Sequence, residues 1–117
     1  MVFKHTLRAF GLFAIVCATS VQAGEWRMLS GPEIEALLDD TRLEYDGAWQ
    51  EFYKSGKTLY NAGRDSWGNW RVQGNLYCSE WPPNAGWDCY AMTKRREVVR
   101  FIDTKGNVSE GTLADLK

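Results

Sequence analysis

The sequence predicts a mainly β domain in which one short helix precedes an antiparallel meander of seven or eight strands. After Thr41 the apolar residues come in short runs separated by turn residues, which is typical of strands. The links between these runs are short, so consecutive strands should form hairpins. Cys78 and Cys89 flank a segment rich in proline and tryptophan, as in a hairpin closed by one disulfide. We expect the meander to close into a small barrel, because an open sheet would leave an exposed edge.

The first 23 residues have the features of a cleaved signal peptide. Lys4 and Arg8 give a positive start, residues 9–18 are almost wholly apolar, and residues 21–23 resemble a signal peptidase site. The apolar run is shorter than the ~20 residues that span a bilayer. We expect cleavage after Ala23, a periplasmic or secreted protein, and no membrane span afterwards.

Removing 23 of the 117 residues leaves 94 and takes away the single histidine, His5. The remaining 12 Lys and Arg face 15 Asp and Glu, a net charge near −3, because Lys4 and Arg8 go with the leader. A mildly acidic chain without a basic stripe gives no reason to expect a nucleic-acid partner. We expect one domain over residues 24–117, and a monomer.

A short helix is expected over residues 31–39. Ser30 and Glu33 have the spacing of a capping box, and Pro32 falls in the first turn, where the N–H that it lacks is not needed. The apolar residues of this segment form one stripe, made of Ile34, Leu37 and Leu38. The helix should pack this stripe against the strands.

The expected strands are short and separated by tight turns. They cover residues 43–45, 49–53, 58–60, 69–72, 76–79, 87–93 and 98–103, with a weaker strand at 108–111. Alternation at period two gives the side chains expected to face inward, which are Trp70 with Val72, Trp87 with Cys89 and Ala91, and Val99 with Phe101.

Several segments of the mature chain carry a resemblance: SGPEIEALL, GNWRVQGNLYCSEWPP, WDCY and VVRFIDTKGNV, together with the turn at Ser55-Gly56 followed by Thr58-Leu59-Tyr60. They resemble small secreted alphaproteobacterial domains of unknown function whose folds are similar to lipocalins. The resemblance implies a lipocalin-like barrel and an exported protein rather than a particular chemistry. Lys94-Arg95-Arg96 departs from it, because such domains have a glycine-containing turn there.

Cys78 and Cys89 are interpreted as a structural disulfide. Redox-active pairs have two residues between the cysteines, whereas ten residues separate these two. A small exported domain benefits from such a cross-link, which adds about 3 kcal/mol in the chain-entropy model. A redox pair is the alternative.

Six aromatic residues are the candidate ligand-binding residues: Trp67, Trp70, Trp81, Trp87, Tyr77 and Tyr90. Aromatic rings combine a large apolar area with a polar tip, so they line small-molecule pockets and protein interfaces. Filling of the core is the alternative, and it is favoured for Trp70 and Trp87. Trp81 precedes Pro82-Pro83 and is expected at a loop tip, either as a pocket lid or contact residue or as a packing anchor.

No residue pattern indicates catalysis or a metal site. Ser66 and Ser79 have no histidine in the mature chain to activate them, which excludes a Ser-His-Asp arrangement. Three carboxylates lie near the tryptophans in sequence without a spacing that indicates a glycosidase, namely Asp65, Glu80 and Asp88. Zinc lacks ligands when both cysteines form a bridge. We therefore expect no catalytic residue, no metal and no cofactor.

The sequence favours a noncatalytic binding module for a small apolar or aromatic ligand or an envelope component. The alternative is a protein-interaction module with a filled core, such as a protease inhibitor or an envelope scaffold. A cavity well below about 300 Å³ would favour this alternative, because it is smaller than typical ligand pockets. An enzyme ranks last, since no motif supports one.

Overall fold

The computed structural model describes residues 24–116, which form nine strands and one helix. The leader predicted for residues 1–23 lies outside the described residues. In chain order the elements are β1 (Arg27–Met28), α1 (Gly31–Leu38), β2 (Thr41–Tyr45), β3 (Ala48–Phe52), β4 (Lys57–Asn61), β5 (Asp65–Gln73), β6 (Leu76–Glu80), β7 (Asp88–Arg95), β8 (Val98–Ile102) and β9 (Val108–Ala114).

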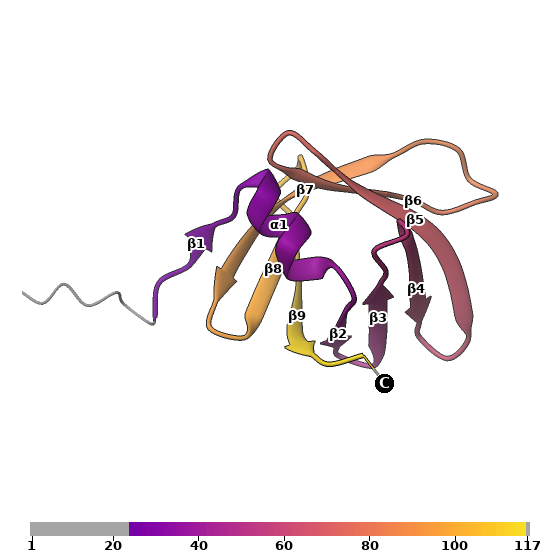
Figure 1. The fold of residues 1–117 in the computed structure, drawn as a ribbon, viewed down its shortest axis with the longest axis horizontal. Helices are drawn as coiled ribbons and strands as arrows, with labels where there is room; N and C mark the ends of the chain where they lie inside the picture. The colour runs from indigo at the N-terminus through magenta and orange to yellow at the C-terminus, as the bar shows by residue number, and fades with distance from the viewer. Residues whose placement is uncertain (1–23, 117) are drawn as a thin grey trace, which may run out of the picture.

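The strands β2 to β9 form a closed antiparallel barrel, which confirms the predicted fold class (Figure 1). Each strand pairs with the next one in sequence, and β9 returns to pair with β2, with Leu43 opposite Leu113. Closure removes the free edges that an open sheet would expose. The two-residue strand β1 is an addition to the barrel, and it pairs with the second half of β7. It is too short to show any periodicity in the sequence.

All eight predicted strands are present, with boundaries that move by a few residues. The largest difference is in β5, which begins at Asp65 instead of residue 69. Residues 65–68 contain a glycine and two polar residues, so they do not resemble a strand on their own. They are extended because they pair with β4, with Leu59 opposite Trp67. Long-range pairing therefore overrides local propensity here.

The inward faces were predicted correctly for β5 and β8 and wrongly for β7. Trp70 and Phe101 are buried in the barrel core. In β7, however, Met92 belongs to the core and Tyr90 packs against it, so the alternate residues Cys89 and Ala91 lie on the outer face. The sequence of β7 does not show which face is inward, because apolar residues occupy both faces and the outer face carries the disulfide.

The helix α1 begins at Gly31, as predicted, and ends at Leu38. Its capping box is present: the Glu33 backbone N–H donates to Ser30 Oγ (3.3 Å), and the Ser30 N–H donates to Glu33 Oε1 (2.9 Å). Ile34 and Leu38 are fully buried in the barrel core. The apolar stripe thus packs against the strands, as expected.

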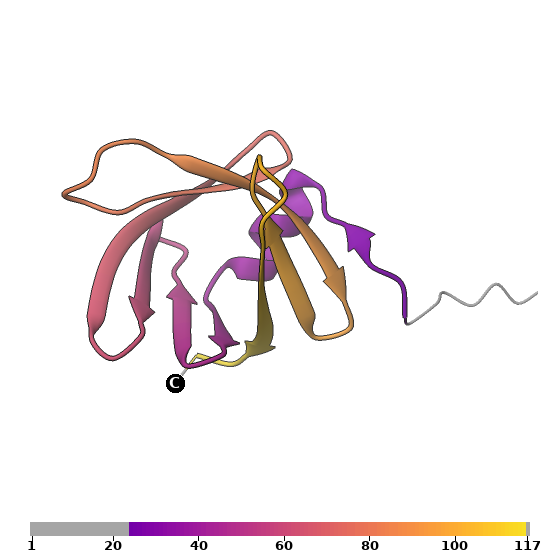
Figure 2. The same cartoon turned by 180° about the vertical axis from the view of Figure 1, so that it is seen from behind.

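The first turn of α1 is docked on the β5–β6 turn, which lies beside it in both views (Figure 2). The Gly31 N–H donates to Asn75 Oδ1 at 2.7 Å. A Cβ at Gly31 would collide with the Gly74 carbonyl, so only glycine permits this approach. The helix therefore covers the barrel end at which β5 finishes and β6 starts.

The β7–β8 hairpin turns through Arg96 and Glu97, since Arg95 pairs with Val98. Arg96 has φ 55°, in the left-handed region that glycine tolerates best. An arginine thus occupies the turn where the resemblance leads us to expect glycine.

Candidate ligand-binding cavity

The barrel contains a cavity of about 530 Å³ at the end opposite α1. Each of the eight barrel strands contributes to its wall. The lining residues are Tyr45, Asp46, Gln50, Tyr60, Ser66, Tyr77, Ser79, Trp81, Tyr90, Phe101, Ser109 and Glu110. The cavity opens to solvent near the β2–β3 and β8–β9 connections, where Asp46, Ser109 and Glu110 are exposed.

The floor of the cavity is built from aromatic rings that contact one another. Tyr77 lies 5.0 Å from Phe101 and 6.1 Å from Tyr90, measured between ring centroids. Below it, Phe52 contacts Tyr77 edge-on, with the centroids 5.8 Å apart. Such pairs add stabilisation beyond that of the buried area. The floor therefore separates the cavity from the aliphatic core under α1.

A buried polar network fixes two of the tyrosines. The Tyr45 hydroxyl donates to Gln50 Oε1 at 2.7 Å, and Gln50 Nε2 donates to Thr58 Oγ1 at 2.9 Å and to the Tyr77 oxygen at 3.4 Å. Thr58 Oγ1 in turn donates to the Glu51 carbonyl. Burial raises the pKa of Tyr45 and of Tyr77 above the ordinary tyrosine value, so both stay neutral at physiological pH.

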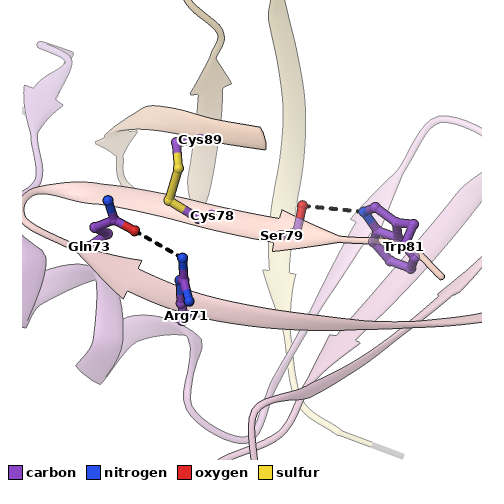
Figure 3. Close-up of a disulfide and its surroundings, with 6 residues drawn as sticks. All are labelled: Arg71, Gln73, Cys78, Ser79, Trp81 and Cys89. Carbon is purple, nitrogen blue, oxygen red and sulfur yellow. Dashed lines mark hydrogen bonds between the residues drawn. A yellow bond between two sulfur atoms is a disulfide. The ribbon is translucent and has the colours of Figure 1, made fainter. Parts of the chain in front are cut away.

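Trp81 forms one wall. Its indole Nε1 donates to Ser79 Oγ at 3.2 Å (Figure 3), and its ring meets Tyr60 edge-on with centroids 6.2 Å apart. Tyr60 continues the wall toward Tyr45, 6.1 Å away. Trp81 lies at the base of the β6–β7 connection rather than at the tip that we expected, and it is half-buried.

Two inward-facing glycines make room for these rings. A Cβ at Gly68 would lie 2.6 Å from Trp81 Cε3, and a Cβ at Gly111 would lie 2.8 Å from Tyr45 Cε1. Neither glycine has a positive φ, so their role is to leave space rather than to permit a turn. Neither glycine was among the site residues predicted from the sequence.

One carboxylate, that of Asp46, lies at the rim of the cavity. Glu110 also belongs to the lining, but it alternates with the inward-facing Ser109 and Gly111 along β9, so its side chain lies on the outer face, where Oε2 accepts a hydrogen bond from Arg100 Nε at 2.7 Å. Among the described residues that line the cavity, none is Lys or Arg. The Asp46 carboxylate at the mouth is therefore unfavourable for anions.

The structure places the six predicted aromatic residues in three different environments. Tyr77, Trp81 and Tyr90 line the cavity. Trp70 is 6% exposed and stacks behind the floor on Tyr77, so the core interpretation holds for it. The other two, Trp67 and Trp87, lie on the outer surface.

Trp67 and Trp87 lie outside the barrel. Trp67 is 53% exposed, and its ring centroid is 6.1 Å from that of Tyr53. Trp87 is half-buried under the Arg71 guanidinium, whose Cζ lies 4.0 Å from the ring centroid. Trp87 is thus not a core residue. In β7, which follows it, the residues that face inward are the alternate set to the predicted one.

The aromatic and amide residues of the lining that were not predicted from the sequence come from β2, β3, β4 and β8. Their signal was the alternation of each strand, which places Tyr45, Gln50, Tyr60 and Phe101 on the inner face. The prediction from the sequence instead favoured the tryptophan-rich region from β5 to β7, where several aromatic residues lie close together in the chain.

Cys78 and Cys89 form the predicted disulfide between directly opposed positions of β6 and β7, with Cα atoms 4.0 Å apart (Figure 3). The neighbouring residues Tyr77 and Tyr90 are also opposite each other and point into the barrel. The bridge on the outer face therefore holds together the two strands that supply part of the cavity floor.

The carboxylates considered for catalysis lie outside the cavity lining. Asp65 Oδ1 accepts a hydrogen bond from Asn61, and Glu80 Oε2 accepts one from Asn69. Within residues 24–116, no three His, Cys, Asp or Glu side chains are grouped so that they could hold a metal ion. No helix in this part of the chain is long and apolar enough to cross a membrane.

Comparisons with known proteins found no matching family model, no matching curated protein and no matching solved structure.

Proposed function

We propose that the protein is a noncatalytic, monomeric binding module of the periplasm or the extracellular space, which holds a small ligand with apolar or aromatic surface inside the barrel. The observation that carries this proposal is the cavity of about 530 Å³. Small-molecule pockets in proteins have volumes of about 300–1,000 Å³. A barrel used only as a rigid scaffold would favour a filled interior.

The chemistry of the lining supports the same proposal. Half of the lining residues are aromatic, and the polar groups among them converge from several strands. Pockets for small ligands combine an apolar wall with a few fixed polar groups in this way. The lining hydroxyl of Tyr45 and the amide of Gln50 are held by internal hydrogen bonds, so the wall is preorganised.

Trp81 bears on the choice between a ligand and a protein partner. A tryptophan that protrudes from a loop would favour contact with another protein. Trp81 is instead half-buried, bonded to Ser79 and packed against Gly68 and Tyr60. This position supports a role as a wall of the cavity.

Export rests on two features. Residues 1–23 have the pattern of a signal peptide. The Cys78–Cys89 bridge is of the kind that persists outside the cytoplasm.

The test is a titration of the mature protein with N-phenyl-1-naphthylamine, a neutral dye whose fluorescence rises in apolar surroundings. We expect saturable binding that is weakened at least several-fold in Trp81→Leu. The matched control is Trp67→Leu, which removes an outer tryptophan and should bind the dye like the wild type. Absence of saturable binding, or equal loss in both variants, would contradict the proposal.

A further inference from the structure

We infer that the cavity selects an organic cation, namely a small ligand that carries an alkylated ammonium group. This inference rests on the proposed function and adds the charge of the ligand to it. Three features of the cavity support it: its aromatic rings, the carboxylate at its rim and the internal hydrogen bonds of part of its wall.

The rings form two contiguous arcs around the cavity. One arc joins Tyr45, Tyr60 and Trp81, with centroid separations of 6.1 and 6.2 Å. The other arc, of Tyr77, Tyr90 and Phe101, has separations of 5.0 to 6.3 Å. An alkylated ammonium is attracted by aromatic faces, and cages of several rings are the usual way in which proteins bind it.

Arginine side chains of the protein stack on tryptophan rings outside the cavity. Within the described residues, guanidinium groups stack on Trp26, Trp49 and Trp87, none of which lines the cavity. Arg71, for example, lies over Trp87 on the outer face. The six rings of the cavity are thus left for a cation that comes from solution.

The Asp46 carboxylate adds a negative field at the mouth. The other charged residue of the lining, Glu110, is paired with Arg100 on the outer face and adds little to this field. A carboxylate near the entrance attracts a cation and repels an anion. A fatty acid or a phosphate ester therefore fits this cavity poorly.

Several hydrogen-bonding groups of the wall are already engaged with one another. The Tyr45 hydroxyl donates to Gln50, the Gln50 amide donates to Thr58 and Tyr77, and the Trp81 indole donates to Ser79. A ligand rich in hydroxyl groups would have to compete with these bonds. An alkylated ammonium presents methyl groups and diffuse charge, so it can bind without breaking these hydrogen bonds.

The test compares phenyltrimethylammonium with tert-butylbenzene, which has the same shape but carbon in place of the charged nitrogen. Each compound displaces N-phenyl-1-naphthylamine from the mature protein. We expect the cation to bind about tenfold more tightly or better, the ratio that one desolvated cation–π site supports. Equal affinity of the two compounds would overturn the inference while the proposed function stands, because the dye reports binding independently.

Two variants connect the preference to the cavity. Asp46→Asn removes a carboxylate from an exposed turn, and Tyr60→Leu removes an aromatic face while keeping apolar area. Both should reduce the cation-to-neutral ratio several-fold, and Trp67→Leu should leave it unchanged. A preference that persists in both variants would show that it arises elsewhere and would overturn the inference. Failure of phenyltrimethylammonium to displace bound dye would overturn it as well.

Discussion

The indole ring of Trp81 occupies the space that a side chain at Gly68 would need. A Cβ at position 68 would lie 2.6 Å from Cε3 and 2.8 Å from Cδ2 of the ring, and 2.7 Å from the Glu80 carbonyl oxygen. Gly68 pairs with Thr58 in β4, so it belongs to a regular stretch of strand. The absence of a side chain in one strand therefore positions the ring that forms the wall of the cavity.

Gly68→Ala should consequently change the cavity without unfolding the barrel. The Glu80 carbonyl and the Trp81 indole must both shift, which costs about 1–3 kcal/mol in a packed site. We expect at least a several-fold loss of dye affinity and a shift of the Trp81 fluorescence. Gly24→Ala is the control, since a Cβ there meets no atom within 4 Å. Unchanged dye affinity in Gly68→Ala would show that Trp81 does not contact the ligand.

Much of the fold could be predicted because its signals are local. The capping box of Ser30 and Glu33, the short runs of apolar residues and the opposed cysteines each depend on a few neighbouring positions. The start of β5 could not be predicted, because Asp65 and Gly68 are extended only by pairing with β4. The inward and outward faces of β7 were predicted wrongly for a related reason, because the disulfide makes the outer face of this strand apolar too.

The cavity was less accessible to sequence reasoning than the barrel. Trp81, Tyr77 and Tyr90 stood out because they flank the cysteines and prolines. Tyr45 and Tyr60 are single rings on other strands, and only barrel closure brings them together with the first three. A lining assembled from eight strands has no compact signature in the sequence.

Arg96→Gly should stabilise the protein. Arg96 has φ 55°, which costs a residue with a Cβ about 1–2 kcal/mol relative to glycine. The greater freedom of glycine in the unfolded chain offsets about 0.5–1 kcal/mol of this gain. The expected net effect is a rise of up to about 1 kcal/mol in the free energy of unfolding, measured by urea denaturation. Glu97→Gly, at the next position of the same turn, should not stabilise, because Glu97 has no positive φ. A less stable Arg96→Gly variant would contradict this account of the turn.

Glu33→Gln should remove part of the acid sensitivity of the fold. The hydrogen bond from the Ser30 backbone N–H, followed by that from Arg27, lowers the pKa of Glu33 below its ordinary value of 4.5. A carboxyl group with a lowered folded-state pKa contributes stability above its unfolded pKa, and this contribution is lost as the pH falls through the folded value. The wild type should therefore be more stable than the variant at neutral pH.

The difference between wild type and Glu33→Gln should shrink steadily once the pH falls below about 4.5. Denaturation midpoints measured over a series of pH values provide the check. Glu35→Gln, on the exposed face of the same helix, is the matched control and should follow the wild type at every pH. A gap between wild type and Glu33→Gln that is independent of pH would show that shape rather than charge accounts for the effect.

Removal of the Cys78–Cys89 bridge should destabilise the β6–β7 hairpin and, with it, the cavity. The cysteines are 11 positions apart, and closing a loop of this size is worth about 3 kcal/mol in the chain-entropy model. For a small domain of ordinary stability, this is a large share of the total. We expect the double variant Cys78→Ala/Cys89→Ala to lose about that amount in urea denaturation and to bind dye more weakly, because Tyr77 and Tyr90 are no longer held opposite each other. A reducing agent should produce the same loss in the wild type and no further change in the double variant. If reduction left the wild-type midpoint unchanged, the bridge would not stabilise the fold, and a redox role for the pair would become the better interpretation.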